Sequence, residues 1–167
     1  MSTPSLRLED SIDFGALPEP INELLQRGVL AYRLSPEAAE EHFQRALALA
    51  PSALPVYFCL YKIHTYGNRL DAALSAAGAG LAEAARQAGW PADFEAWPTN
   101  ALAEPNESAR FALYTLKALA FIRLKREEVG EAARIIARLR ALDPQGYVGW
   151  PVVAELLNAS QRGLASS

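Results

Sequence analysis

The chain has 167 residues, of which 51% are hydrophobic and 21% are charged, and its formal net charge is −3. This length can bury one hydrophobic core, and the composition is near that of an average globular domain, which excludes a chain that is disordered throughout. Alanine and leucine supply much of the apolar content and favour helices, while no useful stretch alternates in the manner of a half-buried strand. The sequence therefore predicts a single all-α domain.

The N-terminal stretch MSTPSLRLEDSIDF is acidic and contains a proline, whereas a secretory signal has a basic start followed by an apolar core. The longest uncharged stretch, 46–61, is interrupted by two prolines and is shorter than the ~20 residues needed to cross a bilayer. Cys59 is the only cysteine, so it has no second thiol with which to form an internal disulfide or to share a zinc ion. We therefore expect a cytoplasmic protein with no membrane span, no metal and no cofactor.

Residues 1–20 contain three prolines and little periodicity, so they are expected to form a loose N-terminal arm. Beyond them, apolar residues recur at helical spacing, and prolines and glycines separate the helical runs. Ser35 suits an N-cap, because its hydroxyl can accept from the first turn and Pro36 follows at the first helical position. Seven helices are predicted in this way, over about 21–34, 36–50, 53–66, 70–88, 108–125, 128–142 and 150–160. The last residues, 161–167, are expected to be a frayed tail.

Residues 89–107, GWPADFEAWPTNALAEPNE, connect the fourth and fifth predicted helices and hold three prolines and three large aromatic residues. A loop of this length inside a compact domain either packs against the domain or has a function. Two roles stay open for its rings. They form a structural patch, or they are part of a binding surface in which Trp90, Phe94 and Trp97 contact a partner.

A spacing of small and bulkier residues recurs along the chain. The first two occurrences, beginning at Ala39 and Ala73, are offset by 34 residues, which is the tetratricopeptide period. The third is displaced by the insertion 89–107. Small residues let the two helices of a hairpin approach closely, and the bulkier middle residue fills the space toward the next hairpin. The three occurrences lie in the second, fourth and sixth predicted helices, at Ala39-Phe43-Ala46, Ala73-Ala77-Gly80 and Ala132-Ile136-Leu139.

With this pattern the chain resembles the tetratricopeptide-repeat (TPR) family, over 21–145 apart from the insertion. The first helix of each pair and two of the turns agree less closely with the family pattern, and an ordinary helical bundle stays open as the alternative. The resemblance implies one domain, 21–160, built as a right-handed superhelix. Its parts would be three helix hairpins and a solvating C-terminal capping helix, at about 21–51, 54–88, 108–144 and 150–160.

The resemblance also implies a function. Members of this family hold an extended peptide or a partner helix in the concave groove, so we expect a non-enzymatic adaptor or chaperone-like scaffold that binds protein or peptide. Small size and an alanine- and arginine-rich composition favour a bacterial origin. An aromatic platform flanked by cations suits a peptide with apolar anchors and an acidic group. The residues expected to face the groove are Tyr32, Arg33, Phe58, Lys62, Thr65 and Tyr66.

Two other functions stay open. The run ALPVYFCLYKIHTYGN resembles small repeat proteins found beside bacterial nitrogen-fixation genes, which would make the protein an accessory or assembly factor. Alternatively, the insertion 89–107 would be a lid over His64 and Tyr66 in an enzyme or small-ligand protein. The sequence offers no metal cluster, phosphate-binding glycine loop or nucleophile elbow, so no catalytic residue is predicted.

Charge is unevenly distributed along the chain. Residues 1–43 carry 3 basic and 8 acidic side chains, while residues 108–140 carry 8 basic and 3 acidic ones. Oppositely charged ends would allow copies to associate head to tail, although a solvated helix face explains the same charges. The negative net charge, and aromatic residues that do not interleave with the basic ones, argue against nucleic acid as a partner.

Overall fold

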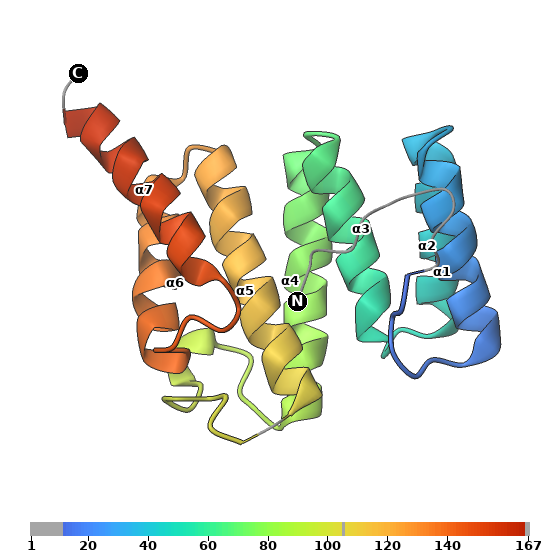
Figure 1. Ribbon diagram of the computed structural model, residues 1–167, viewed down its shortest axis with the longest axis horizontal. Helices are drawn as coiled ribbons and strands as arrows, with labels where there is room; N and C mark the ends of the chain where they lie inside the picture. The colour runs from blue at the N-terminus through green and yellow to red at the C-terminus, as the bar shows by residue number, and fades with distance from the viewer. Residues whose placement is uncertain (1–11, 105, 166–167) are drawn as a thin grey trace.

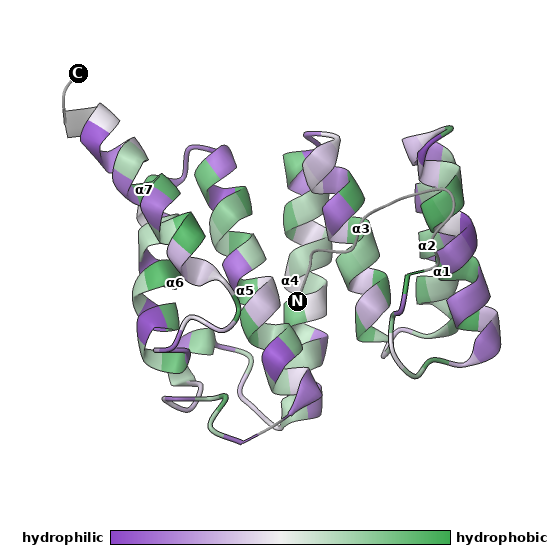
Figure 2. Ribbon diagram, viewed as in Figure 1, coloured by the Kyte–Doolittle hydropathy of each residue, from purple (hydrophilic) through white to green (hydrophobic). Residues whose placement is uncertain are grey.

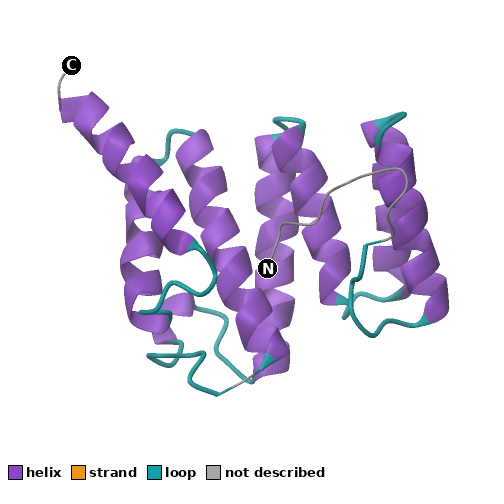
Figure 3. Ribbon diagram, in the orientation of Figure 1, coloured by secondary structure: helices purple, strands orange, loops and turns teal. Residues whose placement is uncertain are grey.

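A computed structural model describes residues 12–104 and 106–165 of the chain. These residues form seven α-helices and one short 3-10 helix, with no strand among them (Figures 1 and 3). The all-α prediction is therefore confirmed. The elements are α1 Glu19–Tyr32, α2 Pro36–Leu49, α3 Leu54–Tyr66, α4 Leu70–Ala88, η1 Phe94–Ala96, α5 Glu107–Lys125, α6 Val129–Leu142 and α7 Trp150–Ala165.

Side-chain caps fix two of the helix starts. The Ser35 hydroxyl accepts a hydrogen bond from the backbone N–H of Ala38 at 3.2 Å, as predicted, and so satisfies one of the unpaired donors in the first turn of α2. At α5 the cap is Asn106, whose side-chain oxygen accepts from the N–H of Ala109 at 3.0 Å. This cap starts α5 at Glu107, one residue before the predicted start at Ser108.

The end of α4 is fixed by backbone geometry. Gly89 has a φ of 74°, in the left-handed region that costs glycine little, and this turn lets the N–H of Trp90 reach the carbonyl of Ala85 at 2.8 Å. The chain therefore leaves α4 sharply and enters the insertion.

Consecutive helices pack in pairs, α1 with α2, α3 with α4 and α5 with α6, and the pairs follow one another side by side (Figure 1). The second pair meets the third mainly through α4 and α5, and α7 packs against α5 and α6. Figure 2 shows hydrophilic residues on the side of α1 that faces away from the other pairs. The core lies between helices in two clusters, one across α1 to α3 and one across α3 to α7.

The predicted recurring positions lie inside this core. Each small or bulkier residue of the pattern is buried, and Ala39, Ala73 and Ala132 are fully so. Gly80 of α4 shows why size matters, because a Cβ atom placed there would lie 2.8 Å from the Cβ of Tyr57 on α3. Close approach of the two helices of a pair therefore depends on the absence of a side chain at this position.

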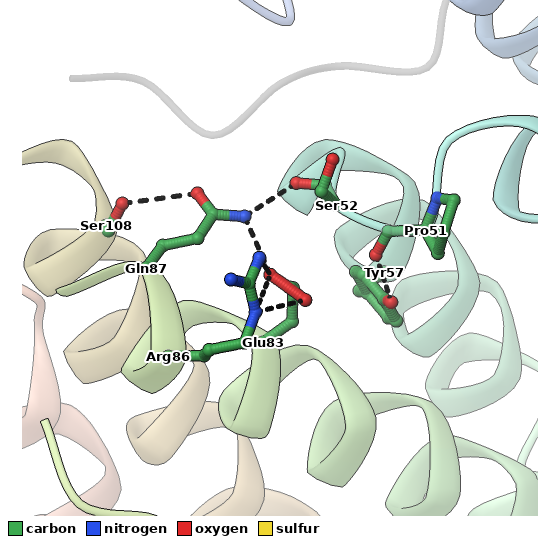
Figure 4. A network of polar contacts seen from close by, with 7 residues as sticks. All are labelled: Pro51, Ser52, Tyr57, Glu83, Arg86, Gln87 and Ser108. Carbon is green, nitrogen blue, oxygen red and sulfur yellow. Dashed lines mark hydrogen bonds and ion pairs between the residues drawn. The ribbon is translucent and has the colours of Figure 1, made fainter. Parts of the chain in front are cut away.

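Gln87 joins the second and third pairs at one end of the molecule (Figure 4). Its side-chain amide donates to the carbonyl of Ser52, before α3, at 2.7 Å, and to the carboxylate of Glu83 at 3.0 Å. The Ser108 hydroxyl of α5 donates to the Gln87 amide oxygen at 3.4 Å. One side chain of α4 thus links the loop before α3 to the start of α5.

The two ends of the chain differ from the prediction. Of the expected loose arm, residues 1–11 lie outside the described residues. Ile12, Phe14 and Leu17 pack against the first core cluster. The last two residues of the arm belong to α1. At the other end, α7 continues to Ala165 instead of ending near Ser160. The residues after Ser160 include glutamine, arginine, leucine and alanine, all good helix formers, so the helix continues into the predicted tail.

A pair of glycine substitutions tests the close packing of α3 and α4. Gly80→Ala should lower the free energy of unfolding by about 1–3 kcal/mol, because the new methyl group meets the base of the Tyr57 side chain. Gly78→Ala is the matched control in the same helix, where an added Cβ meets nothing within 4 Å. That change should raise stability by about 0.5–1 kcal/mol. Urea denaturation followed by circular dichroism measures both, and equal effects would contradict the packing described.

Candidate functional site

One face of α3 carries three of the predicted groove residues. Phe58, Lys62 and Tyr66 follow each other at intervals of four residues, so they line up along the helix. The Lys62 ammonium lies 5.4 Å from the centre of the Phe58 ring and 6.0 Å from that of Tyr66. Both distances are within the range of a cation–π attraction.

A small cavity lies beside this face, between α3 and the first helix pair. Its volume is about 30 Å³, which suits a water molecule and not a larger ligand. Four of the predicted groove residues line it together with two residues of the N-terminal arm. The lining residues are Ile12, Phe14, Val29, Tyr32, Phe43, Phe58, Cys59, Lys62, Ile63 and Tyr66.

Two predicted groove residues do not line this cavity. Arg33 is exposed just beyond the end of α1. The Thr65 hydroxyl donates to the carbonyl of Tyr61 at 2.6 Å, within its own helix. The structure therefore brings together Tyr32, Phe58, Lys62 and Tyr66 but not these two.

The face continues onto α5 through residues that the sequence did not single out. The ring of Tyr114 lies 5.9 Å from that of Phe58, centre to centre. The Lys117 ammonium lies 3.9 Å from the centre of the same Tyr114 ring, and the Lys62 ammonium lies 5.6 Å from it. Two lysines on different helices thus share one aromatic ring.

Tyr61 and Thr115 hold α3 and α5 together beneath this face. Their hydroxyl oxygens are 3.4 Å apart, and the exposed fractions of the two residues are 1% and 0%. Burial raises the pKa of the Tyr61 phenol, so the group stays neutral and able to hydrogen-bond. The pair fixes the register in which α3 and α5 present their lysines.

The two lysines lack a counter-charge. Neither forms an ion pair or a hydrogen bond with any residue in 12–104 or 106–165, whereas Arg123 and Arg126 on α5 and its C-terminal turn both pair with Glu128. Burial and, as a smaller cause, the nearby positive charge of Lys62 together lower the pKa of Lys117 to about 8. An anion bound here would relieve both effects.

We define the lysine–aromatic face as Phe58, Lys62 and Tyr66 of α3 together with Tyr114 and Lys117 of α5. It combines apolar ring surface with positive charge that no described residue neutralises. Such a surface can hold a carboxylate beside an apolar group, because charge-assisted hydrogen bonds to ammonium groups are stronger than neutral ones.

The three aromatic residues of the insertion differ in exposure. Trp97 is buried, with an exposed fraction of 2%, and its indole N–H donates to the carbonyl of Pro91 at 2.7 Å. Trp90 and Phe94 are half-buried, and their ring centres lie 5.0 and 6.4 Å from that of Trp97. The Trp97 ring is therefore part of the core and has little surface left for a partner.

The insertion also completes the end of α6. The backbone N–H groups of Asn100 and Ala101 donate to the carbonyls of Ala141 and Leu142 at 3.0 and 2.8 Å, which satisfies acceptors that a helix C-terminus leaves unpaired. The Arg138 guanidinium of α6 donates to backbone carbonyls of the insertion. This favours the structural role among the two that the sequence left open.

The insertion does not cover His64 and Tyr66. Those residues lie at the C-terminal end of α3, whereas the insertion follows the C-terminal end of α4 and bonds to the C-terminal end of α6, at the opposite end of the helix layer (Figure 1). A helix of 13 residues separates the two ends by about 20 Å. The arrangement does not favour the insertion as a lid over these residues, and that role stays a prediction.

The buried Cys59 thiol and His64 imidazole of α3 lie in different chemical environments. Burial raises the pKa of the Cys59 thiol, which disfavours the reactive thiolate. His64 Nδ1 accepts from Arg69 Nε at 3.1 Å, and its Nε2 lies 3.5 Å from a carboxylate oxygen of Glu40. Burial lowers the His64 pKa, with Glu40 opposing this shift and Arg69 adding to it. In the described part of the chain, no three metal-ligating side chains come together.

The arginines behind the predicted charge asymmetry are largely engaged within the chain. Arg126 pairs with Asp71 as well as Glu128, Arg134 pairs with Glu131, and Arg138 binds the insertion. Association of copies through oppositely charged ends stays a prediction. Among the described helices, none is both long enough and apolar enough to pass through a membrane.

Comparison with known proteins gave no match to a family model, a curated protein or a solved structure. The site is therefore interpreted from its own geometry.

A tryptophan substitution tests the structural role of the insertion. Trp97→Ala should cost about 3–5 kcal/mol of unfolding free energy, because it removes a large buried ring and its hydrogen bond. At this chain length, that loss lowers the melting temperature by roughly 10 °C or more. Tyr147→Ala, which removes an aromatic side chain of a residue that is 65% exposed, is the control. If both variants melted alike, the Trp97 ring would not belong to the core.

The environment of Lys117 predicts an unusual titration. Its ammonium should titrate at about 8 in an NMR titration of the lysine side chains, instead of at 10.5, and Lys62→Gln should move this value upward by removing a like charge. Because the pKa is lower in the folded state, the unfolded chain binds more protons between these values, so stability should rise with pH across that window. Lys125→Gln, farther along α5, should leave Lys117 unchanged. An ordinary pKa for Lys117 would contradict its burial.

Proposed function

We propose that the protein is a TPR-like superhelical binding module, an adaptor or chaperone-like scaffold, that binds an extended peptide carrying an acidic residue next to an apolar one. Three features support the superhelical arrangement. The helices pack as successive pairs, an alanine is buried at the first position of the pattern in each pair, and the first two sets of positions are 34 residues apart. A cytoplasmic, bacterial protein is part of the proposal.

The observation that carries the proposal is the lysine–aromatic face. Lys62 and Lys117 approach the same Tyr114 ring from α3 and α5, and neither has a partner carboxylate in the described residues. Burial of Lys117 and, to a smaller extent, the nearby positive charge of Lys62 lower the pKa of Lys117, so keeping its ammonium charged costs free energy. A ligand with a carboxylate recovers this free energy on binding, and the rings beside it supply apolar contact at low entropic cost.

A peptide fits this face better than a small molecule does. The cavity beside α3 is too small for a ligand, and the face is an open surface shared by two helices. Extended peptides bind such surfaces through side chains that alternate in direction, with apolar anchors on rings and acidic groups on cations. The acidic group sets specificity, while the rings contribute contact area.

A peptide array with matched lysine variants tests the proposal. The wild-type protein should select peptides in which an acidic residue stands beside an apolar one. Lys62→Gln and Lys117→Gln should each weaken binding of the selected peptides by about tenfold, measured by fluorescence anisotropy, since each removes a charge-assisted contact worth about 1.5–3 kcal/mol.

Lys125→Gln is the control, because Lys125 lies on the same helix and over an aromatic ring, that of Phe121, but away from Lys62. Its affinity should match that of the wild type. Selected peptides without acidic residues, or binding that ignores both Lys62 and Lys117, would overturn the proposed function.

A further inference from the structure

Residues 12–17 lie on the binding side of the molecule. Ile12 and Phe14 line the same cavity as Tyr32, Phe58 and Lys62, so the arm covers the part of the α3 face that borders α1. The part that borders α5 carries Tyr114 and Lys117, which do not line this cavity. Residues 12–17 therefore cover the side of the face that borders α1, and among the described residues of the arm none lines a cavity with Tyr114 or Lys117.

The arm is held by backbone recognition as well as by apolar packing. The side-chain amide of Gln26 on α1 donates to the carbonyl of Ile12 at 2.6 Å and accepts from its N–H at 3.2 Å. Asn22 orients that amide by accepting from it at 3.2 Å. A side-chain amide that bonds to both the backbone N–H and the carbonyl of one residue recognises the backbone of a non-helical segment. It does so whatever the side chain of the bound residue.

The turn that follows directs the arm back to α1. The Asp13 carboxylate accepts from the N–H of Gly15 at 2.8 Å, and Gly15 has a φ of 87°, in the left-handed region that disfavours other residues. Asp13 itself is exposed, between the two half-buried apolar side chains of the arm. The pattern seated on the face is thus apolar, acidic, apolar, with the acidic side chain turned outward.

Resting on the function proposed above, we propose that the segment Ile12-Asp13-Phe14 is a built-in competitor for the peptide. It occupies the subsite between α1 and α3, and the external ligand has the same pattern there, with two apolar residues separated by one other residue. Alternate side chains of an extended chain point the same way, so such a ligand can place both in the cavity lining while Gln26 binds its backbone. Binding in this subsite requires that the arm leaves it.

Because the arm is covalently tethered next to the subsite, an external peptide must displace it in order to bind there. A segment tethered by a few residues is present at an effective concentration on the order of mM, so the same sequence added in trans at µM concentration cannot compete with it. Loosening the arm should therefore strengthen the binding of peptides that reach the subsite between α1 and α3, whereas the wild-type protein binds peptides through the α3 and α5 side of the face.

The test uses a fluorescein-labelled peptide of residues 12–18, IDFGALP, as the probe, with fluorescence anisotropy as the readout. Against wild type, binding should be undetectable at tens of µM. Against Ile12→Ser/Phe14→Ser, whose arm no longer fills the cavity, affinity should rise at least tenfold, and adding Gln26→Ala to this variant should reduce it again. A scrambled peptide is the control. Equal binding to wild type and to the double variant, or none to the folded double variant, would overturn the proposal.

Gly15→Ala covers the case in which the double variant does not fold. An added Cβ at Gly15 meets nothing within 4 Å, so this change strains only the turn and keeps every side chain of the arm and the face. It should increase affinity for the probe severalfold, while Gly130→Ala, also unobstructed but in the first turn of α6, should not. No difference between these two variants would count against the arm as a competitor.

The outcome separates this inference from the proposed function. Peptides that bind through Lys62 and Lys117 with no effect of the arm variants would refute the competitor and leave the binding module intact. Probe binding that depends on the arm but not on either lysine would support the competitor and refute the acidic-peptide function. A probe-dependent dimer, detected by light scattering, would mean that arms exchange between copies and would overturn the proposal of an external ligand.

Discussion

Close approach of paired helices is the constraint on which the rest of the structure depends. Alanine at the first recurring position of each pair adds only a methyl group between the helices, and at Gly80 even one added carbon would collide with Tyr57. Nesting at this distance puts α3 and α5 near enough for Tyr61 and Thr115 to meet beneath the surface. Looser pairs would not hold the lysines of two helices over one ring.

The same packing leaves an unbalanced charge on the surface. Arg123, Arg126 and Arg134 pair with neighbouring carboxylates and Arg138 donates to backbone carbonyls. Lys62 and Lys117 have no such partner among the described residues. Burial lowers the pKa of Lys117 to about 8, so a charged ammonium there is kept at a cost in stability. Keeping Lys117 charged despite this cost in stability suits the selective binding of an acidic group. Residues 12–17 cover part of the same face, which suits binding that is limited by competition.

The sequence predicted what depends on local spacing and failed where distant segments meet. Helix positions were found because caps such as Ser35 and breakers such as Gly89 act over a few residues, and burial of the recurring residues followed from their period. Lys117 and Tyr114 were missed because the insertion shifts the third pair out of the period, so their alignment with Lys62 depends on how α5 packs. The hydrogen bonds between the Gln26 amide and the Ile12 backbone were not predicted. A side-chain amide that bonds to a backbone far along the chain leaves no periodic pattern in the sequence.

The most direct measurement is a crystal structure of the protein bound to a peptide selected by its affinity. We expect a peptide lying across α3 and α5, with a carboxylate within hydrogen-bonding distance of Lys62 or Lys117, and with Ile12 and Phe14 displaced from the cavity. A peptide bound to another surface, such as α7, or a carboxylate that touches neither lysine, would contradict this expectation.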